Sequence, residues 1–103
     1  MKAPPQVRML DRIRQAIREQ KYRLSNHANE EMSDDTLEIE DIENIVLTGR
    51  ITRRFTRDPR GTRYVISGDA TDGRRAFVVC RFLPSSTLLI ITAYAQEESE
   101  EQV

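Results

Sequence analysis

A single histidine is the side chain in this sequence best suited to acid–base chemistry. His27 is the only histidine among 103 residues, and an unperturbed imidazole titrates near neutral pH. Cleavage of RNA by 2′-hydroxyl attack needs a general base, a general acid and a cation for the phosphate. His27, Arg63 and either Tyr64 or Tyr94 could supply these groups. The alternative is a structural His27 that packs at a helix start and hydrogen-bonds to a sheet.

Arginines dominate the segment that follows position 49. From residue 50 to residue 75 the bases are Arg50, Arg53, Arg54, Arg57, Arg60, Arg63, Arg74 and Arg75, against only three aspartates. Arginine forms bidentate pairs with phosphate, so we predict nucleic-acid contacts for Arg53, Arg54, Arg57, Arg74 and Arg75. Phe55 and Tyr64 lie among them and could stack on bases. The alternatives are a solvated sheet face, or pairing with the protein's own acids.

Those acids form a block of their own. Residues 26–49 contain eight aspartates and glutamates and no lysine or arginine, and residues 96–103 carry four more glutamates. The formal net charge of −1 therefore conceals strong local fields. The acidic block could dock a basic partner, and we expect the acidic tail, 96–103, to be disordered.

Several classes of site are not expected. Cys80 is the only cysteine, so no intrachain disulfide can form, and its apolar surroundings predict a buried core residue. With one histidine and one cysteine we expect neither a metal site nor a cofactor. No signal-peptide-like or membrane-spanning stretch is found, so we expect a cytoplasmic location without membrane contact.

The hydrophobic spacing predicts a single α+β domain over residues 1–95. Apolar residues recur at helical intervals in residues 6–20, 27–34 and 40–48. The period then changes to two, which predicts strands at 51–57, 63–68, 75–83 and 87–94. Short turns between them favour a four-stranded antiparallel meander, with the helices covering one face in two layers. Residues 21–24 could add an edge strand.

Residues 25–32 read S-N-H-A-N-E-E-M, and this S-x-H-A-x-x-x-M pattern resembles a small bacterial family of unknown function. That family is related to the BrnT and MqsR/RelE-type toxins. The resemblance covers roughly residues 22–94 and continues through 37–49, 63–68, 72–74, 78–79 and 90–94. Some relatives carry arginines at the positions of Glu31 and Asp35; an acidic pair there resembles the branch associated with zinc-finger antitoxins.

The resemblance implies a RelE/BrnT-like fold and the toxin component of a bacterial type II toxin–antitoxin system. Such a toxin would be a metal-independent, mRNA-directed endoribonuclease, and a zinc-finger antitoxin of the YgiT/MqsA type would be its partner. His27 matches the motif histidine, and Tyr94 matches the end of the last strand. Two alternatives remain: a non-enzymatic protein-interaction module with the same fold, and a homodimer whose interface is the first helix.

Overall fold

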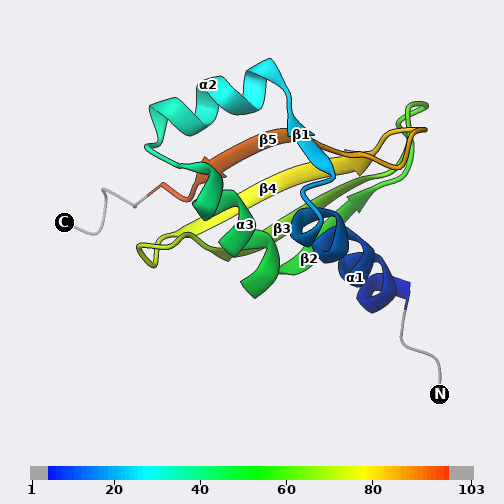
Figure 1. Ribbon diagram of the computed structural model, residues 1–103, viewed down its shortest axis with the longest axis horizontal. Coiled ribbons are helices and arrows are strands. Elements are labelled where there is room, and N and C mark those ends of the chain that lie inside the picture. Colours follow the sequence, from blue (N-terminus) through cyan, green and yellow to red (C-terminus); the bar gives the residue numbers. More distant parts are fainter. Residues whose placement is uncertain (1–4, 98–103) are drawn as a thin grey trace.

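The computed structural model describes residues 5–97 and confirms an α+β protein (Figure 1). Its elements are α1 (Pro5–Arg18), β1 (Tyr22–Leu24), α2 (Asn26–Asp34), α3 (Ile39–Thr48), β2 (Arg50–Phe55), β3 (Arg63–Asp69), β4 (Arg75–Phe82) and β5 (Leu88–Ala95). The three helices lie where the apolar spacing predicts them, and four of the strands match the predicted ones closely. The predicted tail, 96–103, falls mostly outside the described residues.

The sheet has five strands and is mixed, so the predicted four-stranded antiparallel sheet was wrong. Its strand order is β1-β5-β4-β3-β2. Strands β2 to β5 do form an antiparallel meander, but β1 adds to β5 in parallel, with Tyr22 opposite Leu88 and Leu24 opposite Ile90. A parallel pair needs a long crossover, and the chain between β1 and β5 supplies it. Strand β1 thereby covers the edge of β5 at its apolar residues Leu88, Leu89 and Ile90.

One face of the sheet carries the core. Ile66, Val78 and Ile90 are fully buried on β3, β4 and β5. All three helices contribute to the same cluster, through Ile13 and Ile17 of α1, Ala28 and Met32 of α2, and Ile42, Ile45 and Val46 of α3. The apolar face of α1 is thus buried within the chain, and the dimer through this helix stays a prediction. Cys80 is fully buried as predicted, and burial raises the pKa of its thiol to about 12.

Helix α3 approaches β3 unusually closely. A Cβ on Gly49 would lie 2.5 Å from the carbonyl oxygens of Ile45 and Ser67, and one on Gly68 would meet the carbonyl of Ile45. Only glycine fits at these two positions. The Arg14 side chain then ties α1 to the same point, since its Nε donates to the Val46 carbonyl (3.1 Å) and Nη2 donates to the Gly49 carbonyl (2.7 Å).

The opposite face of the sheet carries no helix within the described residues. We call it the open face. Cross-strand partners point to the same side of a sheet, and the pairing places these residues on it: Arg23, Arg50, Arg53, Phe55, Arg63, Val65, Ser67, Asp69, Arg75, Phe77, Val79, Arg81, Leu89, Thr92 and Tyr94. Its valines, leucine and aromatic rings lie between arginines, so this face is neither a plain core nor a plain solvated surface.

The two ends of the open face differ in the turns that border them. The β2–β3 and β4–β5 turns lie at one end of the sheet, and the β3–β4 turn and the end of β5 lie at the other (Figure 1). The predicted turn at 58–61 is confirmed by the Gly61 N–H, which donates to the Asp58 carbonyl (3.0 Å). Within the described residues no helix combines the length and hydrophobicity needed to cross a membrane.

Candidate functional site

The motif around His27 is held in place mainly by its other residues. Ser25 caps α2: its Oγ accepts a hydrogen bond from the Ala28 N–H (3.0 Å) and donates to the Ile91 carbonyl of β5 (2.8 Å). Ala28 is fully buried and Met32 nearly so. The side chain of His27 is 62% exposed, and its Nε2 lies 3.3 Å from Oε1 of Glu31. The histidine therefore stands at the surface, paired with one carboxylate.

Glu31 and Asp35 bond to the edge of β5 beyond the point where its pairing with β1 ends. Oε1 of Glu31 accepts from the Ala93 N–H (3.3 Å), and Oδ2 of Asp35 accepts from the Ala95 N–H (2.8 Å). The two carboxylates are four residues apart on the helix and their donors are two apart on the strand, so the spacings match. Since arginine cannot accept a hydrogen bond, the acids at these positions have a structural role that arginines could not perform.

The four residues predicted for catalysis lie in three different places. Tyr64 pairs with Cys80 and points into the core, where it is 8% exposed. Arg63, its neighbour, points to the open face beside Phe55. Tyr94 lies opposite Phe77 of β4. Arg63 and Tyr94 lie on β3 and β5, the two strands that flank β4. Counting residues along β4 places them about 13 Å apart along the strands, and two strand spacings place them about 10 Å apart across the sheet.

Only His27 and Tyr94 come near a common pocket. Glu31, the partner of His27, lines a pocket of about 390 Å³ at the end of β5, together with Tyr94. Its other lining residues are Asp34, Asp35, Phe77, Ala95, Gln96 and Glu97. All four charged groups of this lining are carboxylates, which repel phosphate. Among the described residues, this lining offers the histidine no cation for a phosphate, and its catalytic role stays a prediction.

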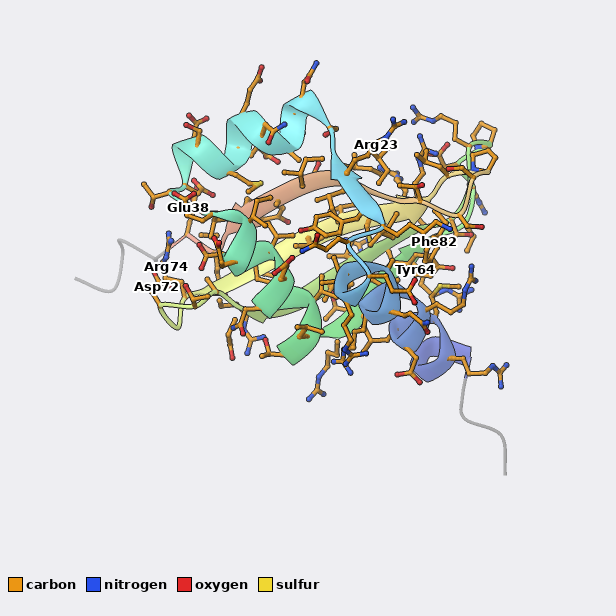
Figure 2. The ribbon with its side chains drawn as sticks, in the orientation of Figure 1. Arg23, Glu38, Tyr64, Asp72, Arg74 and Phe82 are labelled. Carbon is orange, nitrogen blue, oxygen red and sulfur yellow. The ribbon has the colours of Figure 1, made fainter. Side chains whose placement is uncertain are left out.

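Two of the five arginines predicted for nucleic-acid contact are engaged at the acidic end. The guanidinium of Arg74 donates to Asp72 and to the backbone carbonyls of Asp35 (2.8 Å) and Thr36 (3.1 Å), so it fastens the end of α2. Figure 2 shows Arg74 and Asp72 on the side of Glu38, away from Tyr64. Arg75 lies on the open face, 3.8 Å from a carboxylate oxygen of Asp69.

The other three arginines lie at the opposite end of the sheet, where Arg53 shares the open face with Phe55, whereas Arg54, paired with Tyr64, starts from the helix side. The guanidinium carbon of Arg53 lies 4.8 Å from the centre of the Phe55 ring, and that of Arg63 lies 5.0 Å from it. Arg54 and Arg57 line a pocket beside this ring. A guanidinium over an aromatic face keeps its N–H donors available at its rim.

Asp58 is the carboxylate that pairs with arginines at this end of the sheet. Asp58 accepts two side-chain hydrogen bonds from Arg60 and one from the Arg60 N–H, and these hold the pKa of Asp58 below its ordinary value. Nε of Arg63 lies 3.5 Å from Asp58. Neither Arg53 nor Arg57 pairs with an acid of the described residues. The arginines at this end of the sheet therefore do not neutralise the acidic helices.

The open face contains further residues that the sequence did not single out. Strand pairing brings Arg23 of β1 and Arg81 of β4 to Leu89 of β5, and Arg23 lies outside the arginine-rich segment. Between these bases and Arg53 lie Val65 and Val79. Alternation along β1 and β4 could have indicated Arg23 and Arg81, but not which face of the sheet they share. We call Arg23, Arg53, Phe55, Arg63, Val65, Val79, Arg81 and Leu89 the basic half of the open face.

Comparisons with known proteins give a family but no annotated relative. No curated protein and no solved structure matches the chain. Within the described residues no group of three or more His, Cys, Asp and Glu side chains is arranged to hold a metal ion. A family model matches residues 24–95, from the end of β1 to the end of β5, and leaves α1 outside. The chain thus belongs to the family described as a domain of unknown function, DUF4258.

Proposed function

We propose that this protein binds single-stranded RNA on the basic half of its open face. The observation that carries the proposal is the pair of guanidinium groups held over Phe55, those of Arg53 and Arg63. Positive charge that the protein's own acidic helices leave unneutralised favours a polyanionic partner. The guanidinium N–H groups suit phosphate oxygens.

The apolar residues between the arginines favour a single strand over a duplex. Val79 and Leu89, both partly exposed, lie in the middle of this surface beside the buried Val65, flanked by Arg53, Arg81 and Arg23. Unpaired bases offer flat apolar faces that pack on such a surface, whereas a duplex presents mainly its phosphates. A β-sheet face with basic and apolar side chains is a common surface for single-stranded RNA.

Binding of a labelled single-stranded RNA, followed by fluorescence anisotropy at several salt concentrations, tests this function. Each phosphate contact contributes about 0.7 to the slope of log K against log salt for a single strand. Arg53→Gln and Arg63→Gln should each weaken binding and reduce that slope by about 0.7. Arg18→Gln is the matched control, because Arg18 is an exposed arginine at the end of α1.

The two outcomes are clearly separated. Weaker binding and a smaller slope in the two sheet variants, with little change in Arg18→Gln, support the proposal. Equal effects of all three substitutions, or no measurable affinity of the wild-type protein for RNA, contradict it.

We further propose that the protein is the toxin component of a type II toxin–antitoxin pair with a RelE/BrnT-like fold. The S-x-H-A-x-x-x-M resemblance supports this, and the cognate partner would be a zinc-finger antitoxin. Expression without the antitoxin should arrest growth and cleave mRNA, and His27→Ala should relieve the arrest, because it removes the proposed acid–base group. Normal growth with abundant folded protein and intact mRNA would contradict the toxin proposal while leaving RNA binding open to its own test.

A specific observation favours a second candidate, the non-enzymatic interaction module. The other end of the open face places the rings of Phe77 and Tyr94, 5.2 Å apart, beside four carboxylates. A basic segment of a partner protein fits this end by charge and by cation–π contact. The measurement is copurification with the product of the neighbouring gene. A stable heterodimer without RNA binding or nuclease activity would favour this candidate over the first.

A further inference from the structure

The turn between β2 and β3 encloses a pocket of about 510 Å³. It lies at the basic end of the open face, and its charged lining residues are Arg54, Arg57, Asp58, Arg60 and Arg63. Phe55 forms an apolar wall. Pockets for nucleotides and other small molecules commonly occupy about 300–1,000 Å³, so a nucleotide-sized group fits here.

The lining carries far more positive than negative charge. Four arginines face one aspartate, and that aspartate is already occupied by hydrogen bonds from the Arg60 side chain and backbone. Arg54 and Arg57 make no ion pair with any described residue. Their mutual repulsion is relieved most directly by an anion bound among them.

One donor in the pocket lacks an acceptor. Nε of Arg63 is shielded from solvent and has no hydrogen-bond partner. Its distance of 3.5 Å from Asp58 allows Coulomb attraction, but the hydrogen-bond geometry is not met. A shielded N–H without an acceptor is unfavourable and rare. Because this nitrogen is shielded even from water, an oxygen of a bound anion would satisfy it only once the Arg63 side chain turns toward the pocket.

The ring of Phe55 also contacts the guanidinium of Arg63. Its contact with the Arg63 guanidinium, 5.0 Å from ring centre to carbon, restricts that side chain before any ligand arrives. A preoriented guanidinium loses less freedom when it binds than a mobile lysine would. The pocket therefore combines excess positive charge with an arginine that already lies against its apolar wall.

We propose that this pocket binds a phosphomonoester, the terminal phosphate of a nucleotide or of an RNA strand. This inference rests on the proposed RNA-binding function and specifies what one end of its surface recognises. A terminal phosphate carries about −1.5 to −2 charge at pH 7 and three acceptor oxygens, whereas a phosphodiester inside a strand carries one charge. Four arginines against one aspartate match the dianion better.

The test compares three RNA oligonucleotides of one sequence on the full-length chain: one with a 5′-phosphate, one with a 3′-phosphate and one with hydroxyl groups at both ends. We expect one phosphorylated form to bind about tenfold more tightly than the hydroxyl form, and the preferred end identifies the polarity of the bound strand. Adenosine monophosphate, adenosine and inorganic phosphate, titrated separately, show whether the nucleoside contributes to binding in the pocket.

Variants distinguish the pocket from the rest of the surface. Arg63→Lys keeps the charge but removes the planar fork and the Nε donor, so the ratio of the affinities for phosphate-ended and hydroxyl-ended RNA should fall to about one, whatever the effect on hydroxyl-ended RNA. Arg57→Gln should reduce the same preference. Arg18→Gln, outside the pocket, should preserve it.

The possible failures are distinguishable. If RNA binds but all three ends bind equally, the pocket inference is overturned and the proposed function stands. If no RNA binds but adenosine monophosphate does so in an Arg63-dependent manner, the pocket stands and RNA binding fails. If neither ligand binds, both are overturned.

Discussion

Asp41 is the clearest example of one residue that fixes the framework under the site. It is the only charged residue of the described residues that is buried as a whole, at 6% exposure. Oδ2 accepts from the Glu38 N–H (2.8 Å), and Oδ1 accepts from the N–H (2.8 Å) and hydroxyl (2.6 Å) of Thr71. Burial raises the pKa of Asp41, but these donors, with the nearby Arg74, outweigh it, and the net pKa is lowered from 3.8.

The direction of this shift predicts how stability depends on pH. Since the folded-state pKa of Asp41 is below its unfolded value, the ionised carboxylate contributes stability above about pH 4, and this contribution is lost as the pH falls through the lowered pKa. Asp41→Asn should reduce the free energy of unfolding at pH 7 by about 1–3 kcal/mol. The difference between variant and wild type should shrink in acid.

Urea unfolding at pH 7 and near pH 2.5 measures both effects. Glu30→Gln is the control, because Glu30 is an exposed acid of α2. A wild-type protein and an Asp41→Asn variant with the same stability at pH 7 would contradict this account of Asp41.

At the scale of elements, the contact between α2 and β5 involves the S-x-H-A-x-x-x-M residues. Ser25→Ala removes the N-cap of α2 and the hydrogen bond to the Ile91 carbonyl. The loss of such a cap costs about 0.5–2 kcal/mol, so the melting temperature should fall. His27→Ala should leave it nearly unchanged, because that side chain is exposed. Thermal unfolding followed by circular dichroism measures the melting temperatures of the two variants. Equal decreases in both would contradict the conclusion that Ser25, rather than His27, holds α2 in place.

The elements themselves could be predicted where a pattern has one interpretation. Apolar spacing located the helices, and Asp58 with Gly61 located the β2–β3 turn. The parallel pairing of β1 with β5 could not be predicted, because three residues hold too little pattern and their partner lies far along the chain. Tertiary packing of Tyr22 and Leu24 decides it.

The site was predictable only in part, for a related reason. Alternation along β2 predicts one face for Ile51, Arg53 and Phe55. A bulge between Ile51 and Arg53 turns Ile51 to the core side, so only Arg53 and Phe55 share the open face. Strand β3 is buried on both sides around Tyr64, Val65 and Ile66, so its sequence does not show which face meets the helices. That ambiguity placed Tyr64 among the candidate base-stacking residues, whereas the fold buries its ring.

At the scale of the whole molecule, acidic and basic side chains concentrate at opposite ends of one sheet face, although Arg74 and Arg75 of the arginine-rich segment lie at the acidic end. The acidic block, on α2 and at the end of β5, surrounds Tyr94, and the arginines surround Phe55 at the opposite end. The two blocks do not cancel each other, since Glu31 and Asp35 bond to the backbone of β5 instead. A bound RNA strand should therefore lie at the basic end and avoid the acidic one.

The most direct test of this claim is an NMR titration of isotope-labelled protein with hydroxyl-ended single-stranded RNA, read as the shift of each backbone amide. Our account predicts the largest shifts around Phe55, Arg63 and Arg81, with little change in α1 and α3. Shifts concentrated on the helices or around Tyr94, or no shifts at RNA concentrations in large excess, would contradict an RNA-binding surface on the basic half of the open face.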